Sequence, residues 1–89
     1  MKFFTSLIAT AVFAAAPAQA NTAQFIHYAN QGSSNIIRGT ELIKAGDLQA
    51  GCALMNKGAN QIAIANSFSN DQQTLDTYYS AKATIRNRC

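Results

Sequence analysis

The chain has 89 residues, of which 48% are hydrophobic, with seven basic and four acidic residues and a formal net charge of +3. A net charge this small is too weak for nucleic-acid binding by counterion release, which excludes that class of function. The length allows one small domain, and a domain of this size is only marginally stable without an additional constraint.

The first twenty residues have the pattern of a secretory signal peptide. Lys2 precedes an apolar run over residues 3–16, and Ala18-Gln19-Ala20 follows as a small-x-small cleavage site. The alternative is a permanent membrane anchor, but the run is shorter than the ~20 residues that span a bilayer. We therefore expect cleavage after Ala20, one mature domain over residues 21–89, a periplasmic or secreted location, and no stable membrane insertion.

The mature segment is expected to be helical throughout, because proline is absent after Pro17 and no strand-like alternation persists. A first helix is expected from about Thr22 to Ala45. Its apolar side consists of Phe25, Ile26, Ala29, Ile36, Ile37, Leu42 and Ile43. The segment 32–34, Gly-Ser-Ser, lies inside this helix, and the sequence leaves open whether it splits or bends the helix.

Gly46 and Asp47 mark the first chain reversal. Glycine is favoured at the left-handed position that closes a helix, and aspartate at the N-cap of the next helix. A second helix is expected from Leu48 to about Asn66. Its apolar stripe consists of Leu48, Cys52, Met55, Ala59 and Ile62.

Ser69 and Gln72 have the spacing of a capping box, and Asp71 would complement the dipole of the same helix start. A third helix is expected from Asn70 to near Cys89. Its stripe consists of Leu75, Tyr78, Tyr79, Ile85 and Cys89, with Lys82 laying its methylenes along the core. The predicted fold class is all-α, a small antiparallel three-helix bundle made of a helical hairpin and a C-terminal helix.

Cys52 and Cys89 are the only cysteines in the sequence. An even number of cysteines in a small exported chain indicates a disulfide. A short turn between the second and third helices also brings the start of one beside the end of the other. The bridge would contribute ~3–4 kcal/mol of stability. Free thiols are the alternative, and a metal site lacks ligands because His27 is the only histidine.

Five glycines in helical segments need an explanation, because each interior helix glycine costs ~1 kcal/mol relative to alanine. They form two groups with intervals of seven residues, Gly32, Gly39 and Gly46 in one and Gly51 and Gly58 in the other. A hairpin folded about residues 47–49 would place small residues of one helix opposite small residues of the other. The expected pairs are Gly46–Gly51, Gly39–Gly58 and Gly32–Ala65. Such a seam lets two helix backbones approach closely. It could equally pair two chains, which leaves the oligomeric state open. The alternative is that scattered glycines loosen mobile helices.

Residues 35–62 resemble the helix-turn-helix unit of a tetratricopeptide repeat. The residues that carry the resemblance are Gly39, Leu42, Gly46, Asp47, Leu48, Gly51, Met55 and Gly58. They supply small and large residues at the offsets of that motif, with a Gly-Asp turn between the helices. Asn35 and Arg38 stand where the repeat has Trp and Leu. The resemblance implies a helical hairpin that binds a protein or a peptide.

The sequence offers little for catalysis. His27 lies between Ile26 and Tyr28, and one histidine without an evident nucleophile or carboxylate is typical of a packed or surface residue. No Gly-rich phosphate loop or Cys-x-x-Cys motif occurs. We therefore expect a protein that is not an enzyme and has no cofactor. Metal binding or enzymatic activity based on His27 is the least favoured hypothesis.

The C-terminal helix carries the candidate binding surface. Its members are Tyr78, Tyr79, Lys82, Arg86 and Arg88. Two interpretations of the cations are open: they complement the negative end of the helix, or they attract an acidic partner or anionic lipid head groups. The sequence thus predicts a non-enzymatic protein- or peptide-binding module. A small periplasmic stress or chaperone-like protein is the second hypothesis, although the chain has few titrating groups.

Overall fold

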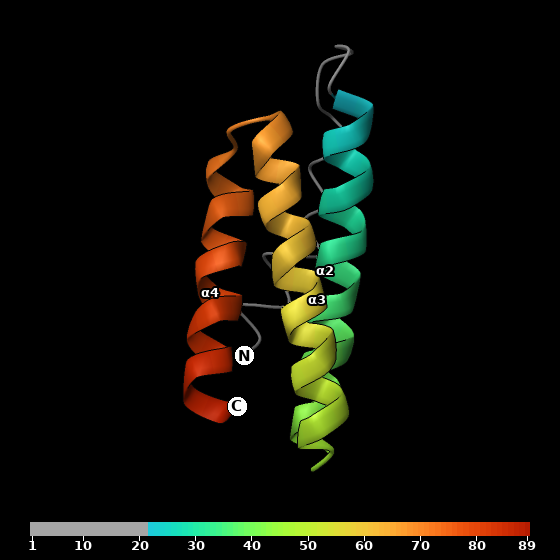
Figure 1. Cartoon of the computed structure of the whole chain (residues 1–89), viewed down its shortest axis with the longest axis vertical. Coiled ribbons are helices and arrows are strands. Elements are labelled where there is room, and N and C mark those ends of the chain that lie inside the picture. Colours follow the sequence, from blue (N-terminus) through green and yellow to red (C-terminus); the bar gives the residue numbers. More distant parts are fainter. Residues whose placement is uncertain (1–21) are drawn as a thin grey trace.

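The computed structural model describes residues 22–89, so the predicted signal peptide over residues 1–20 lies outside the described residues. Three helices follow one another along the described chain: α2 (Thr22–Lys44), α3 (Leu48–Phe68) and α4 (Gln72–Arg88). They pack antiparallel, with α3 between α2 and α4, and with the two connections at opposite ends (Figure 1). The predicted fold class is confirmed.

Helix α2 is one continuous helix through residues 32–34, which answers the question that the sequence left open. Gly32 and Ser33 are both buried there, and packing against the neighbouring helices offsets the weak helix propensity of these residues.

Thr40 donates its hydroxyl to the carbonyl oxygen of Ile36 at 2.8 Å, so this side chain adds no unpaired polar group.

The reversal between α2 and α3 is confirmed as a glycine-closed turn followed by an aspartate cap. Gly46 has φ +95°, and its amide and that of Asp47 donate to the carbonyl oxygens of Ile43 and Leu42. This pair of bonds is a Schellman motif, which satisfies the last carbonyl groups of α2. The Asp47 carboxylate then accepts from the amide of Ala50 at 3.3 Å at the start of α3.

The start of α4 differs from the prediction. Asp71 is the N-cap, and its carboxylate accepts from the amide of Thr74 at 2.9 Å and from the Thr74 hydroxyl at 2.7 Å. Ser69 instead ends α3, its amide donating to the carbonyl oxygen of Ala65. The predicted capping box of Ser69 and Gln72 is therefore wrong, because Asp71, two residues closer to the first free amides, is the N-cap and makes both bonds.

The glycine seam between α2 and α3 consists of Gly32, Gly39, Gly51 and Gly58, all of them buried. A Cβ atom placed on Gly39 would lie 2.8 Å from the carbonyl oxygen of Gly51, and one on Gly58 would lie 2.7 Å from that of Gly32. Real Cβ atoms do not approach backbone oxygens this closely. The two backbones are therefore in direct contact at these points.

The pairing along the glycine seam is not the predicted one. Gly39 is opposite Gly51 rather than Gly58, and Gly32 is opposite Gly58 rather than Ala65. Gly46 is not part of the contact, since an added Cβ atom there would meet nothing within 4 Å. The helices reverse at residues 45–47, earlier than the residues 47–49 assumed from the sequence, and this shifts the pairing by one seven-residue interval.

Each glycine of the seam receives a large apolar side chain from the other helix. The side chains that lie within 3 Å of the added Cβ positions are Ile62 at Gly32, Met55 at Gly39, Ile43 at Gly51 and Ile36 at Gly58. Every one of them stands four residues after a seam glycine of its own helix. One sequence pattern, Gly-x-x-x-Ile/Met, thus occurs four times and builds both sides of the contact.

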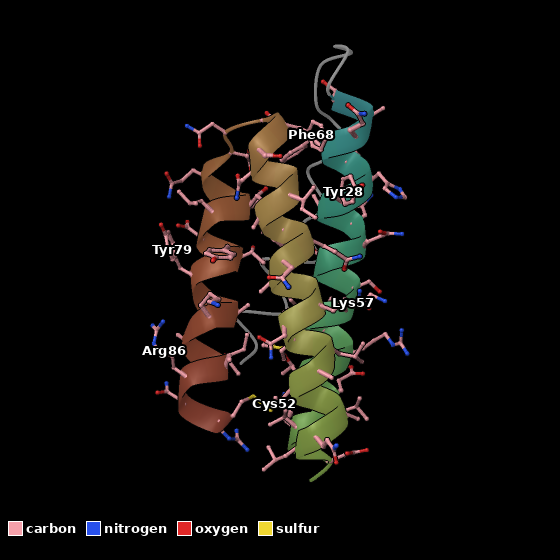
Figure 2. The ribbon with its side chains drawn as sticks, viewed as in Figure 1. Tyr28, Cys52, Lys57, Phe68, Tyr79 and Arg86 are labelled. Carbon is pink, nitrogen blue, oxygen red and sulfur yellow. A yellow bond between two sulfur atoms is a disulfide. The ribbon has the colours of Figure 1, made fainter. Side chains whose placement is uncertain are left out.

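The core forms two clusters along α3. The larger consists of Ile36, Ile43, Met55, Ala59, Ile62 and Ala81, against which Ile37, Cys52, Tyr78 and Ile85 pack. The smaller consists of Phe25, Ala29 and Ala65, with Ile26, Tyr28 and Phe68. The rings of Tyr28 and Phe68 stack with centroids 5.9 Å apart at the end of the molecule where α2 begins (Figure 2).

Helix α4 packs with a different face from the predicted stripe. Its buried residues are Thr74, Thr77 and Ala81, whereas Tyr79 is 60% exposed. Tyr78 and Ile85 do pack against the core, as expected. Leu48 of the second predicted stripe is also largely exposed, at 47%. Thr77 can be buried on the face toward α3 because its hydroxyl donates to the carbonyl oxygen of Gln73 in its own helix, so no unpaired polar group results.

Candidate binding surfaces on helix α4

The predicted disulfide joins Cys52, in the first turns of α3, to Cys89, the C-cap of α4. The two Cα atoms are 6.0 Å apart, a separation usual for disulfides. Cys52 also packs against the larger core cluster. The bridge therefore fixes the last turn of α4 beside the start of α3 (Figure 2).

The five residues of the predicted binding surface do not lie on one surface. Tyr79, Lys82 and Arg86 follow one another at intervals of three and four residues and so share one side of α4. Arg88 is two residues beyond Arg86 and points about 200° away from it around the helix. Helical spacing therefore places Arg86 and Arg88 on different sides of α4, and we describe them as parts of two surfaces.

The first surface, which we name the Tyr79 surface, consists of Tyr79, Lys82 and Arg86. Tyr79 and Arg86 are exposed and Lys82 is half-buried. Figure 2 shows Tyr79 and Arg86 on the same helix, with Lys57 on the other side of the molecule. Tyr78 does not share this surface, because its side chain packs on the core while its ring meets that of Tyr79 edge-on at 5.5 Å.

The second surface is a pocket between the C-terminal ends of α2 and α4, with a volume of about 210 Å³. Its walls are formed by Thr40, Ile43, Lys44, Thr84, Asn87 and Arg88. Of these residues only Arg88 was singled out from the sequence. The sequence did contain a signal for this pocket. Both α2 and α4 have a basic residue in the last turn, and both helices run antiparallel to α3, so their last turns lie at the same end of the bundle.

His27 is exposed and its ring meets that of Tyr28 edge-on, with centroids 5.2 Å apart. Between residues 22 and 89, no group of three or more histidine, cysteine, aspartate or glutamate side chains is placed to hold a metal ion. No helix in the same range combines the length and the apolarity needed to cross a membrane.

No family model matches the chain, and neither characterised proteins nor solved structures give a significant match.

Proposed function

We propose that the protein is an exported, non-catalytic module that binds another protein or a peptide. Two features support export: the signal-peptide pattern of residues 1–20 and the disulfide between Cys52 and Cys89. Disulfides persist mainly in the periplasm and outside the cell, where thiols are not kept reduced.

The exposure of Tyr79 carries the binding proposal. Tyrosine and arginine are enriched among the residues that dominate binding energies, because they offer large contact areas and hydrogen-bond donors. Tyr79 is 60% exposed, and Lys82 and Arg86 flank it on the same side of α4. Within residues 22–89 neither cation makes an ion pair. The surface thus favours a partner that contributes acidic side chains around an apolar contact.

The arrangement of His27 among residues 22–89 supports a non-catalytic role. Nucleophilic and acid–base mechanisms need a base oriented by a second group. His27 is the single histidine of the chain, and inside the described range it makes a ring contact with Tyr28 but no hydrogen bond or ion pair. The resemblance of residues 35–62 to a tetratricopeptide-repeat unit supports peptide binding independently.

Site-specific photocrosslinking tests the proposal. A benzophenone amino acid at position 79, in protein exported by its own host, is expected to give discrete adducts of defined mass. The same amino acid at Lys57, which is exposed on α3 on the other side of the molecule, is the matched control. Arg86→Glu should reduce the adducts at position 79, and Lys57→Glu should leave them unchanged. Identical adduct patterns at the two positions, or none at position 79, would refute the binding surface.

A further inference from the structure

The pocket between α2 and α4 differs from the Tyr79 surface in shape and chemistry. Its volume, about 210 Å³, is below the ~300–1,000 Å³ of sites for drug-sized ligands. It therefore fits a single side chain or a small molecule. The pocket lies on the opposite side of α4 from Arg86, so it is a second site beyond the proposed function.

The inner wall of the pocket is apolar. Ile43 belongs to the larger core cluster and is 4% exposed. Thr40 and Thr84 have already donated their hydroxyl protons to carbonyl oxygens of their own helices, at 2.8 Å and 3.1 Å. These side chains therefore offer methyl groups and acceptor oxygens, and the inner wall suits an apolar group.

The rim of the pocket is cationic. Lys44 and Arg88 are exposed at the ends of α2 and α4, and neither makes an ion pair with any residue from 22 to 89. Each helix end contributes a partial negative charge of about half a unit. The full positive charges of Lys44 and Arg88 exceed these partial charges, so the rim attracts an anionic group.

Both walls of the pocket are held in place before a ligand arrives. Arg88 directly precedes Cys89, which the disulfide ties to α3. On the other wall, the backbone beside Lys44 is fixed by the turn in which Gly46 and Asp47 donate to the last carbonyl groups of α2. A preformed site loses less conformational entropy on binding than a flexible one.

We propose that this pocket binds the C-terminal residue of a peptide. An apolar C-terminal side chain would pack on Ile43, and the terminal carboxylate would lie between Lys44 and Arg88. Asn87 favours a peptide over a fatty acid, because its amide makes no hydrogen bond within the described chain and can pair with a peptide group. Two cations around a carboxylate give charge-assisted hydrogen bonds that a neutral ligand cannot form.

N-acetyl-leucine is the probe for the first test, because it has a carboxylate, an apolar side chain and one peptide group. Titration into ¹⁵N-labelled oxidised protein should shift the amide resonances of Ile43, Lys44, Asn87 and Arg88, with saturation in the millimolar range or below. N-acetyl-leucinamide should shift them at least tenfold more weakly. Equal shifts with the amide, or no shifts with the acid, would overturn the proposal. Hexanoate binding as tightly as N-acetyl-leucine would overturn the assignment to a peptide.

Charge removal is the second test. Lys44→Gln and Arg88→Gln should each weaken binding of N-acetyl-leucine about tenfold, because each removes a charged hydrogen-bond donor. Lys57→Gln is the matched control and should leave the affinity unchanged, since Lys57 is exposed elsewhere on α3. All three residues are exposed, so the fold should be retained, and circular dichroism checks this. Unchanged affinity in Lys44→Gln and Arg88→Gln would overturn the site, whatever the crosslinking at position 79 shows.

Discussion

Helix α3 has two neighbours, and it is held to them by different means. Against α2, four glycines bring the backbones into contact, and Ile36, Ile43, Met55 and Ile62 fill the space beside them. In the contact between α3 and α4, the buried residues of α4 are Thr74, Thr77 and Ala81, and a disulfide joins the two helices at one end. The first contact depends on shape, and the second depends on a covalent bond.

This difference follows from the apolar area that each helix can bury. Burial is worth about 25 cal/mol per Å² of apolar surface, and threonine and alanine supply little of it. The inner face of α4 therefore gains less than the inner face of α2, which buries Phe25, Ile36 and Ile43. A cross-link lowers the entropy of the unfolded chain, so it stabilises α4 without requiring more apolar surface.

Removing the disulfide should have the largest effect. Cys52→Ser with Cys89→Ser opens a loop with a sequence separation of 37 residues, and the free energy of unfolding should fall by about 4 kcal/mol. Urea denaturation measures this loss. Amide hydrogen exchange should then be fastest in α4 and slower along α2, because the glycine seam is untouched. Uniform exchange in α2 and α4 would contradict the distinction between the two contacts.

A methyl group in the glycine seam should have the next largest effect. Alanine at position 58 gains about 1 kcal/mol of helix propensity, but its Cβ would lie 2.7 Å from the Gly32 carbonyl oxygen. We expect Gly58→Ala to destabilise the protein by about 2 kcal/mol, because the two backbones must separate. Ala53→Gly, at an exposed position of α3, is the control and should cost only the propensity term of about 1 kcal/mol. A stabilising Gly58→Ala would show that the helices are not in backbone contact.

The two aspartate caps allow a matched comparison of smaller effects. Asp71→Ala removes two bonds, at 2.9 Å and 2.7 Å, and should destabilise the protein by about 1 kcal/mol. Asp47→Ala removes one exposed bond of 3.3 Å and should have a smaller effect. Thermal melts of the two variants measure the difference, and the reverse order would contradict the cap assigned to α4.

Ser33 gives the smallest expected change, in the opposite direction. Its hydroxyl oxygen is buried and has no hydrogen-bond partner among residues 22–89. Ser33→Ala removes this unpaired polar atom, so the protein should become more stable by up to about 1 kcal/mol. Ser34→Ala, at the exposed neighbouring position, separates this gain from helix propensity. Equal melting temperatures for the two variants would argue that Ser33 is hydrated.

The sequence predicted the helices, the antiparallel order and the disulfide, because local signals such as Gly46, Asp47 and the two cysteines determine them. It predicted the glycine contact but not its pairing. A seven-residue repeat is compatible with two pairings that differ by one interval, and the position of the turn decides between them. The Gly-x-x-x-Ile/Met pattern contains the missing information, since each large side chain must face a glycine of the other helix.

The face of α4 could not be predicted from apolar residues alone. Tyr78 and Tyr79 are adjacent, so only one of them can pack inward, and their apolar character does not say which. Tyr79 is the exposed one, because it lies half a turn from Thr77, which packs inward. The predicted binding surface on α4 falls on two sides of the helix because the sequence did not show which face of α4 packs inward. Arg88 lies toward α2 and Arg86 away from it, and only the position of α2 relative to α4 shows that Lys44 joins Arg88 at a pocket.

The fourfold pattern of the glycine seam also has a consequence for symmetry. Gly39 and Gly51 each lie against the other's carbonyl oxygen, and Gly32 and Gly58 do the same. A half-turn rotation about an axis between α2 and α3 therefore exchanges the two helices and places each of these glycine pairs on the other. The surface of one helix is complementary to a rotated copy of itself, so a short motif, duplicated within each helix, specifies both sides of the interface.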